Sequence, residues 1–124
     1  RYARADGSAL LARAGVDVVL ATFSNHNASG LRFMAANAVR AGLAPEVALR
    51  AITLNAAQAY GKDRSYGSID RGKVANLVVW TGNQLEPTGY AEYIVVQGKL
   101  QSTDSRQTKL ARKYIKRLGL GGKR

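Results

Sequence analysis

The stretch Gly67-Ser-Ile-Asp-Arg-Gly-Lys-Val-Ala-Asn-Leu-Val-Val-Trp-Thr-Gly82 decides how the rest of this sequence is interpreted. Turns that contain glycine flank a lysine, and a short apolar run then ends at Gly82. Glycine adopts the backbone angles that tight turns require, and a run rich in valine is typical of a strand. We therefore expect a polar turn followed by a strand over residues 75–81.

Length and composition indicate one folded domain of ordinary type. The chain has 124 residues, 46% of them hydrophobic and 22% charged, which argues against wholesale disorder. It contains no cysteine, which excludes disulfide scaffolds and cysteine-based zinc sites but leaves the compartment open between cytoplasm and periplasm. No apolar run approaches the roughly 20 residues that cross a membrane, and the first residues lack the apolar core of a signal peptide.

The net charge of +11 is concentrated toward the end of the chain. Eight of the 19 basic residues and one acid lie from Asp104 onward, which gives this tail +7 and leaves +4 for the rest. A basic tail suggests RNA or an anionic membrane as a partner, but this one lacks a known recognition motif and has no aromatic residue beyond Tyr114. We therefore favour an amphipathic helix that docks its apolar side on the protein and consider nucleic acid unsupported as a partner.

Helical spacing of apolar residues dominates the first half of the chain. Asp6 or Ser8 is expected to cap a first helix that Gly15 ends. The helix after residues 31–41 begins at Pro45, a residue favoured in the first turn. Asn55 is the expected N-cap of the last of these helices. The predicted helices cover residues 9–15, 31–41 with Gly42 as the stop, 45–52, and 56–60 with Gly61 as the stop.

Strand patterns occupy the space between and after these helices. Residues 16–22 form an apolar, β-branched run, which predicts a strand buried on both faces and, with its neighbouring helices, a parallel α/β unit. Residues 92–97 and 100–102 are expected to form a hairpin around Gly98-Lys99. Asp104-Ser105 then caps a terminal helix. Its apolar side is made of Leu110, Tyr114, Ile115 and Leu118.

Four segments in this order resemble the C-terminal third of amidohydrolase-superfamily enzymes, metal-dependent hydrolases that act mostly on carbon–nitrogen bonds. Residues 67–82 look like the element Gly-Ser-Ile-Glu-x-Gly-Lys-x-Ala-Asp-Leu-Val. Residues 37–61 look like the stretch Ala-x-x-Gly-(Leu/Met)-x-x-x-x-Ala-Leu-x-x-(Ala/Val)-Thr-x-Asn-Pro-Ala-x-x-x-Gly. Residues 93–100 are similar to the closing hairpin, and residues 105–114 are similar to tails of imidazolonepropionase-like amidohydrolases.

The resemblance implies an α/β fold: a (β/α)8 barrel flanked by a β-sandwich to which both chain ends contribute. Residues 1–62 would supply the last barrel strand and its helices, 63–103 the C-terminal strands of the sandwich, and 104–124 a basic amphipathic helix and tail. A barrel of this type needs roughly 250 residues. We therefore expect a C-terminal fragment whose partner is the missing N-terminal part of the same protein, with an oligomer left open.

The resemblance also implies a cofactor and a small-molecule substrate. Histidines on other strands, often with a lysine carbamate, hold one or two divalent ions, with zinc expected, and these ions lower the pKa of a bound water. An aspartate at the end of the last barrel strand takes a proton from that water and passes it to the leaving nitrogen. Because only this last strand lies within the chain, we expect the chain alone to bind no metal tightly and to be inactive.

The expected aspartate is missing from Thr22-Phe-Ser-Asn-His26. Ser24 or Asn25 stands at its place, and neither is a general base like a carboxylate. A shifted alignment, an acid relocated in a subfamily, or lost activity would each explain the difference. His26 and Asn27 are candidates for substrate binding, although ordinary turn chemistry explains them as well, and one imidazole does not hold zinc.

The favoured function is thus the C-terminal portion of a metal-dependent amidohydrolase. Two alternatives stay open. A small basic nucleic-acid-binding domain would lose affinity steeply with salt. A non-catalytic amidohydrolase-like protein would account for the missing aspartate.

Overall fold

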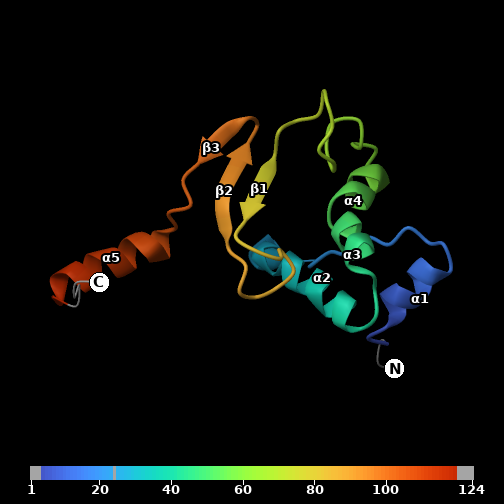
Figure 1. Ribbon diagram of the computed structural model, residues 1–124, viewed down its shortest axis with the longest axis horizontal. Coiled ribbons are helices and arrows are strands. Elements are labelled where there is room, and N and C mark those ends of the chain that lie inside the picture. Colours follow the sequence, from blue (N-terminus) through green and yellow to red (C-terminus); the bar gives the residue numbers. More distant parts are fainter. Residues whose placement is uncertain (1–3, 24, 120–124) are drawn as a thin grey trace.

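The computed structural model describes residues 4–23 and 25–119 as a group of short helices beside a three-stranded sheet, with one further helix projecting from the sheet (Figure 1). The helices precede the sheet in the chain, so the order is helical body, sheet, terminal helix. The elements are α1 (Gly7–Arg13), the 3-10 helix η1 (Asn25–Gly30), α2 (Leu31–Arg40), α3 (Pro45–Ala51), α4 (Leu54–Ala59), β1 (Leu77–Trp80), β2 (Ala91–Val96), β3 (Lys99–Gln101) and α5 (Arg106–Arg117).

The expected helix ends are confirmed where glycine or proline defines them. Gly15, Gly42 and Gly61 follow α1, α2 and α4 with φ of 81°, 101° and 62°. These left-handed angles cost a residue with a Cβ more than they cost glycine. Pro45 begins α3, where its missing N–H is no loss, and Glu46 follows in the first turn.

Two of the expected helix caps are wrong, because their side chains have other partners. Asp6 occupies the N-cap position of α1 but caps nothing; its carboxylate instead accepts hydrogen bonds from Arg4 at 2.9 and 2.8 Å. Asn55 lies inside α4, whose N-cap is Thr53, and its amide reaches a distant backbone carbonyl. Local pattern could not reveal the long-range contact of Asn55.

The core lies among the helices and consists mainly of alanine. Helices α1, α2 and α3 meet there, and Leu43 and Leu85 add larger side chains. Small residues let the helix backbones approach closely while each buries little apolar surface. The buried cluster is Ala9, Ala35, Ala36, Ala38, Leu43, Ala48 and Leu85.

Residues 16–22 do not form the expected strand, and no parallel pair exists among the described residues. The segment runs along the helices instead: Leu20 N donates to Ala51 O at 3.2 Å, and Val18 is buried. Val16 and Val19 are half exposed. A strand buried on both faces needs neighbouring strands to pair with it. The predicted strand is therefore wrong: its residues are typical of a strand, but no strand lies beside the segment among the described residues.

The sheet is antiparallel with the order β1-β2-β3. Leu77 lies opposite Val95 in β2, and Val95 lies opposite Leu100 in β3. The hairpin turn is Gln97-Gly98, with φ of 51° and 75°, one residue earlier than the predicted Gly98-Lys99. Two successive positive φ values match the right-handed twist of a two-residue hairpin. The strands predicted at 75–81 and 92–97 are confirmed within two residues at each end.

Four contacts fix the sheet and its loops to the helical body. Gly67 has φ of 95°, and a Cβ there would lie 2.8 Å from the Cβ of Ala57 in α4. The loop between β1 and β2 inserts Leu85 into the helical core. In the same loop, Gly89 O accepts a 2.7 Å hydrogen bond from Arg32 of α2, and the Arg32 guanidinium lies 5.0 Å from the Trp80 ring centroid.

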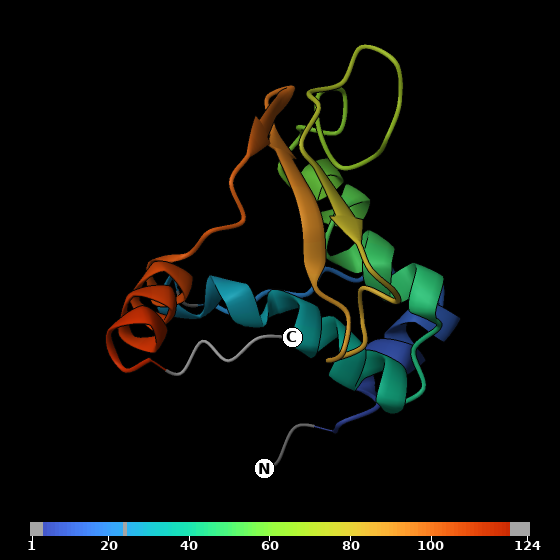
Figure 2. The same cartoon turned by 60° about the vertical axis from the view of Figure 1, so that its left-hand side comes forward.

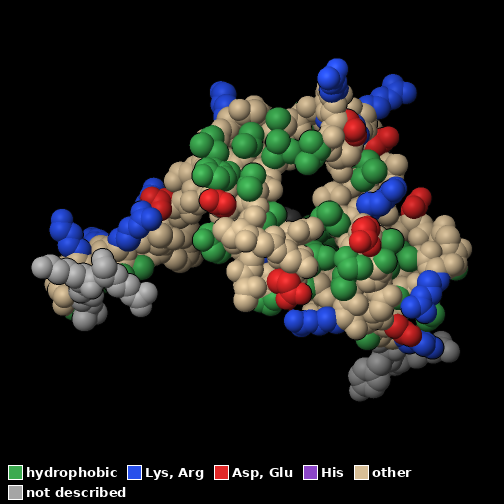
Figure 3. Space-filling view, in the orientation of Figure 1, with side chains coloured by type: hydrophobic (Ala, Val, Ile, Leu, Met, Phe, Trp, Pro, Cys, Tyr) green, Lys and Arg blue, Asp and Glu red, His purple; other side chains and the backbone are tan. Residues whose placement is uncertain are grey.

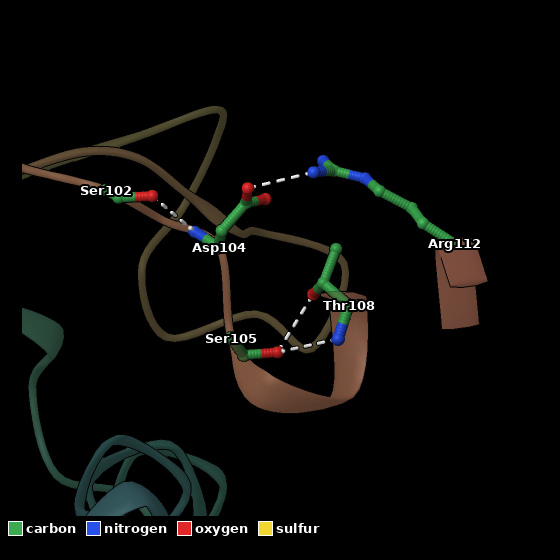
Figure 4. A network of polar contacts seen from close by, with 5 residues as sticks. All are labelled: Ser102, Asp104, Ser105, Thr108 and Arg112. Carbon is green, nitrogen blue, oxygen red and sulfur yellow. Dashed lines mark hydrogen bonds and ion pairs between the residues drawn. The ribbon is translucent and has the colours of Figure 1, made fainter. Parts of the chain in front are cut away.

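Helix α5 begins as predicted, with Ser105 as its N-cap. Ser105 Oγ accepts a hydrogen bond from Thr108 N at 3.0 Å, and Arg112 pairs with Asp104 at 2.8 Å (Figure 4). In the second view α5 again lies apart from β2 and β3 (Figure 2). No residue of α5 is buried, so the expected docking of its apolar side is not found in the part of the chain that is described.

Candidate functional site

The candidate residues predicted from the sequence follow the end of the 16–22 segment. Phe23 has φ of 52° and is 98% exposed. A bulky residue in left-handed backbone is uncommon, and such strain concentrates at functional sites. Ser24 lies outside the described residues. Asn25 and His26 are described in their backbone alone, as the first two residues of η1.

Asn27 is the one candidate whose side chain is described. It is exposed, and its backbone angles of −110° and 20° kink η1. Its amide lies over Gly30, where a Cβ would come within 2.7 Å of Asn27 Oδ1. Gly30 leaves room for this amide directly before α2. A substrate-binding role for Asn27 stays a prediction.

A buried asparagine anchors the segment that leads to these residues. Asn55 is 5% exposed, and its Nδ2 donates to Val18 O at 2.9 Å. Arg50 Nε donates to the other side of the same amide, to Asn55 Oδ1, at 3.5 Å. A buried carbonyl without a hydrogen-bond partner lowers the stability of the fold. This hydrogen bond therefore fixes the backbone of the 16–22 segment against α4. Asn55 therefore constrains the segment that precedes the candidate residues.

A large cavity of about 1090 Å³ separates the helices from the sheet, and Figure 3 shows the hollow. Its walls are mainly apolar and come from α3, α4, β1 and the turns around Gly67. Among its described lining residues there is no carboxylate and no imidazole, so the cavity wall offers no general base of those kinds. Asn27 does not line it either. The cavity and Asn27 are thus separate features.

The described residues do not fit the expected metal. Among the side chains that the structure describes, which do not include that of His26, no three His, Asp or Glu come together as ligands. Zinc sites in proteins use at least three protein ligands drawn from Cys, His, Asp and Glu, and this chain has no cysteine. No chemical step on a metal can be built from this part of the chain.

Asp70 belongs to a local network on the surface. Its carboxylate accepts a hydrogen bond from Ser68, and Lys73 donates to Ser68 and lies 3.5 Å from Asp70. The Ser68 hydrogen bond, and then Lys73, hold the pKa of the Asp70 carboxyl below its usual range. All three residues stabilise the turn around Gly72. These local contacts support a structural role for the Asp70–Lys73 turn.

Comparison with known proteins places these features in a family. Residues 4–107 match the sequence model of the Amidohydrolase family, and that range includes both the helical body and the sheet. The chain belongs to the amidohydrolase family. The resemblance inferred from four sequence segments is therefore confirmed.

Named relatives of this amidohydrolase chain point to one branch. An imidazolonepropionase from Acinetobacter baumannii (strain AB307-0294) is 53% identical over 38 residues, which are 31% of this chain and 10% of the relative. An imidazolonepropionase from Flavobacterium johnsoniae is 37% identical over 71 residues, 54% of this chain and 17% of the relative. This amidohydrolase chain therefore matches only a small part of each relative's length.

A solved structure shares the fold as well. The crystal structure of an amidohydrolase from Thermotoga maritima MSB8 is 29% identical and has a TM-score of 0.73, over 79% of this chain and 26% of that one. A mixture of helices and a small antiparallel sheet is thus found in a known amidohydrolase.

The sequence analysis missed the long-range contacts of Asn55 and Arg32 in this amidohydrolase chain. Asn55 does occupy the Asn position of the family stretch Thr-x-Asn, which was a usable signal. Arg32 offered none, since its partners Trp80 and Gly89 are far along the chain.

Proposed function

We propose that this chain is the C-terminal portion of a metal-dependent amidohydrolase that hydrolyses a carbon–nitrogen bond of the imidazolonepropionate type. Residues 1–62 supply the last strand and helices of its barrel, 63–103 its share of a sandwich, and 104–124 an appended helix. The observation that carries the proposal is the family match over residues 4–107. The shared name of the relatives supports the substrate class.

In this proposal the chain positions a site that other parts of the protein complete. Ser24 or Asn25 stands where the family acid is expected, and His26 and Asn27 face the substrate. Asn55 holds the approaching segment through Val18 O. The metal, with zinc as the expected ion, is held by residues outside the described part of this chain, and the isolated chain is inactive.

The test compares this chain alone with the same chain joined to its upstream polypeptide. Hydrolysis of imidazolonepropionate and bound metal are measured for both proteins. We expect metal and turnover in the longer protein and neither in the chain alone. Stoichiometric, submicromolar zinc binding together with hydrolysis by the isolated chain would overturn the proposal that other parts of the protein hold the metal. A metal-loaded longer protein inert toward imidazolonepropionate and related cyclic amides would overturn the substrate class.

A second experiment separates a lost acid from a relocated one. Ser24→Asp and Asn25→Asp are made in the longer protein, and kcat is measured across pH. If the acid was lost, one variant gains turnover, and its kcat falls at low pH as the introduced aspartate becomes protonated. If the wild type already shows such a titration and neither variant gains, the acid is elsewhere. Asn27→Asp, two residues further on, is the matched control.

A further inference from the structure

Helix α5 divides cleanly into two faces. Leu110, Tyr114 and Leu118 follow one another at four-residue spacing, and Ile115 lies beside Tyr114 on the same side. The opposite side carries six cations and no acid, and Ala111 is the remaining apolar residue of the helix. These cations are Arg106, Lys109, Arg112, Lys113, Lys116 and Arg117.

Both faces are open. Leu110, Tyr114, Ile115 and Leu118 are 50%, 49%, 46% and 64% exposed, which is unusual for four adjacent large apolar residues. Figure 1 shows α5 extending away from the sheet, and Figure 3 shows basic side chains along it. Four residues separate β3 from α5, so the helix is attached to the body by a short connection.

The charge and the apolar face together select the partner. A nucleic acid would use the cations but leave four apolar side chains in water. An apolar groove on a protein would use the apolar face but gain nothing from six cations. A bilayer with anionic headgroups uses both, because a helix lying in the interface buries its apolar face and places its cations at the headgroups.

We propose that α5 is an in-plane anchor that binds the surface of an anionic lipid bilayer. It lies on the membrane and does not cross it: the helix has 12 residues, and no helix in the described ranges is long and apolar enough to span a bilayer. The Ser105 cap and the Asp104–Arg112 ion pair stabilise the first turns without lipid. A preformed helix loses less conformational freedom on binding. This inference is independent of the proposed hydrolysis.

The experiment measures partitioning of the whole chain onto vesicles. One vesicle contains phosphatidylcholine alone, and the other contains equal amounts of phosphatidylcholine and phosphatidylglycerol. Leu110→Ser/Ile115→Ser removes apolar area and keeps the charge. Lys109→Gln/Lys113→Gln removes charge and keeps the apolar face. The matched controls on β3 are Leu100→Ser and Lys99→Gln, since both residues are exposed but lie outside α5. Circular dichroism checks that each body remains folded.

We expect binding to the anionic vesicle only, weaker by at least about tenfold in the apolar variant and by about thirtyfold in the charge variant. Both β3 controls should bind like the wild type. Equal losses in the controls, or unchanged vesicle binding in the apolar variant, would overturn the proposal. The proposal would also be overturned if the chain did not bind vesicles but bound polyuridylate tightly, and the apolar variant kept that binding. This result would assign α5 to RNA. A concentration-dependent dimer that the apolar variant abolishes, without vesicle binding, would assign the face to a second copy.

Discussion

Helices α2 and α5 have the same kind of periodicity but opposite environments. Helix α2 buries Ala35, Ala36 and Ala38 against its neighbours, whereas α5 buries no residue. The first is held by α1, α3 and the loop that carries Leu85; the second is held by its own cap and one ion pair. Helical spacing thus shows that an apolar face exists, but only the remainder of the fold shows what covers it.

The sharpest way to break this comparison is the same substitution in both helices. Ala35→Leu inserts a large side chain into a site with 0% exposure and should lower the free energy of unfolding by about 3 kcal/mol. Ala111→Leu in exposed α5 should change it by less than about 0.5 kcal/mol. Chemical denaturation of both variants provides the measurement. Equal losses would mean that α5 is packed as tightly as α2.

The next largest effect concerns the anchored 16–22 segment. Asn55→Leu removes the donor to Val18 O and should cost about 2 kcal/mol, because a buried carbonyl loses its partner. The control is Asn37→Leu at an exposed position of α2, for which almost no loss is expected. Thermal unfolding measures both. If the two variants matched, the Asn55 bond would not hold the segment.

A smaller effect should stay inside α5. Ser105→Ala removes the cap of Thr108 N and should destabilise this helix by about 1 kcal/mol. Because α5 is nearly independent of the body, we expect faster amide exchange in residues 106–117 and an unchanged global unfolding curve. Ser29→Ala, at an exposed position of η1, serves as the control. A matching shift of the global transition would show that α5 and the body unfold together.

The smallest effect is a titration at the surface. The pKa of Asp70 lies below its usual range because of the Ser68 hydrogen bond and Lys73, so its contribution to stability is complete above the usual aspartate pKa and lost as pH falls through the lower folded value. Ser68→Ala should raise the pKa of Asp70 toward normal, and Ser65→Ala should not. Carboxyl NMR titration reads this directly; an unmoved Asp70 midpoint in Ser68→Ala would contradict the contact.

How much the sequence could predict follows the range of each interaction. Gly15, Gly42 and Gly61 end helices through their own backbone angles, so local pattern sufficed. Ser105 caps α5 through the N–H of Thr108, only three residues away, and that contact was also predictable. Asn55 contacts Val18 across 37 residues, and the sequence interpretation assigned it to a local cap instead.

The strand expected at 16–22 failed for a related reason. Its valines and leucine form a sound strand pattern, but pairing depends on strands that the described residues do not include. The candidate residues Ser24, Asn25, His26 and Asn27 came from a family pattern, and only Asn27 has a described side chain. The family itself was predictable because its glycine, lysine and Thr-x-Asn elements are local and ordered.

The alanine core has a calorimetric consequence. Heat capacity change and denaturant sensitivity both grow with the apolar area exposed on unfolding. Among the residues that the structure describes, six of the nine buried hydrophobic side chains are alanine, so each of these six contributes little of that area. The body should therefore melt over a broad temperature range with a shallow denaturant slope. Additional polypeptide that covered the cavity and the exposed sheet would bury more apolar area. The unfolding transition would then become sharper even if the helices themselves did not change.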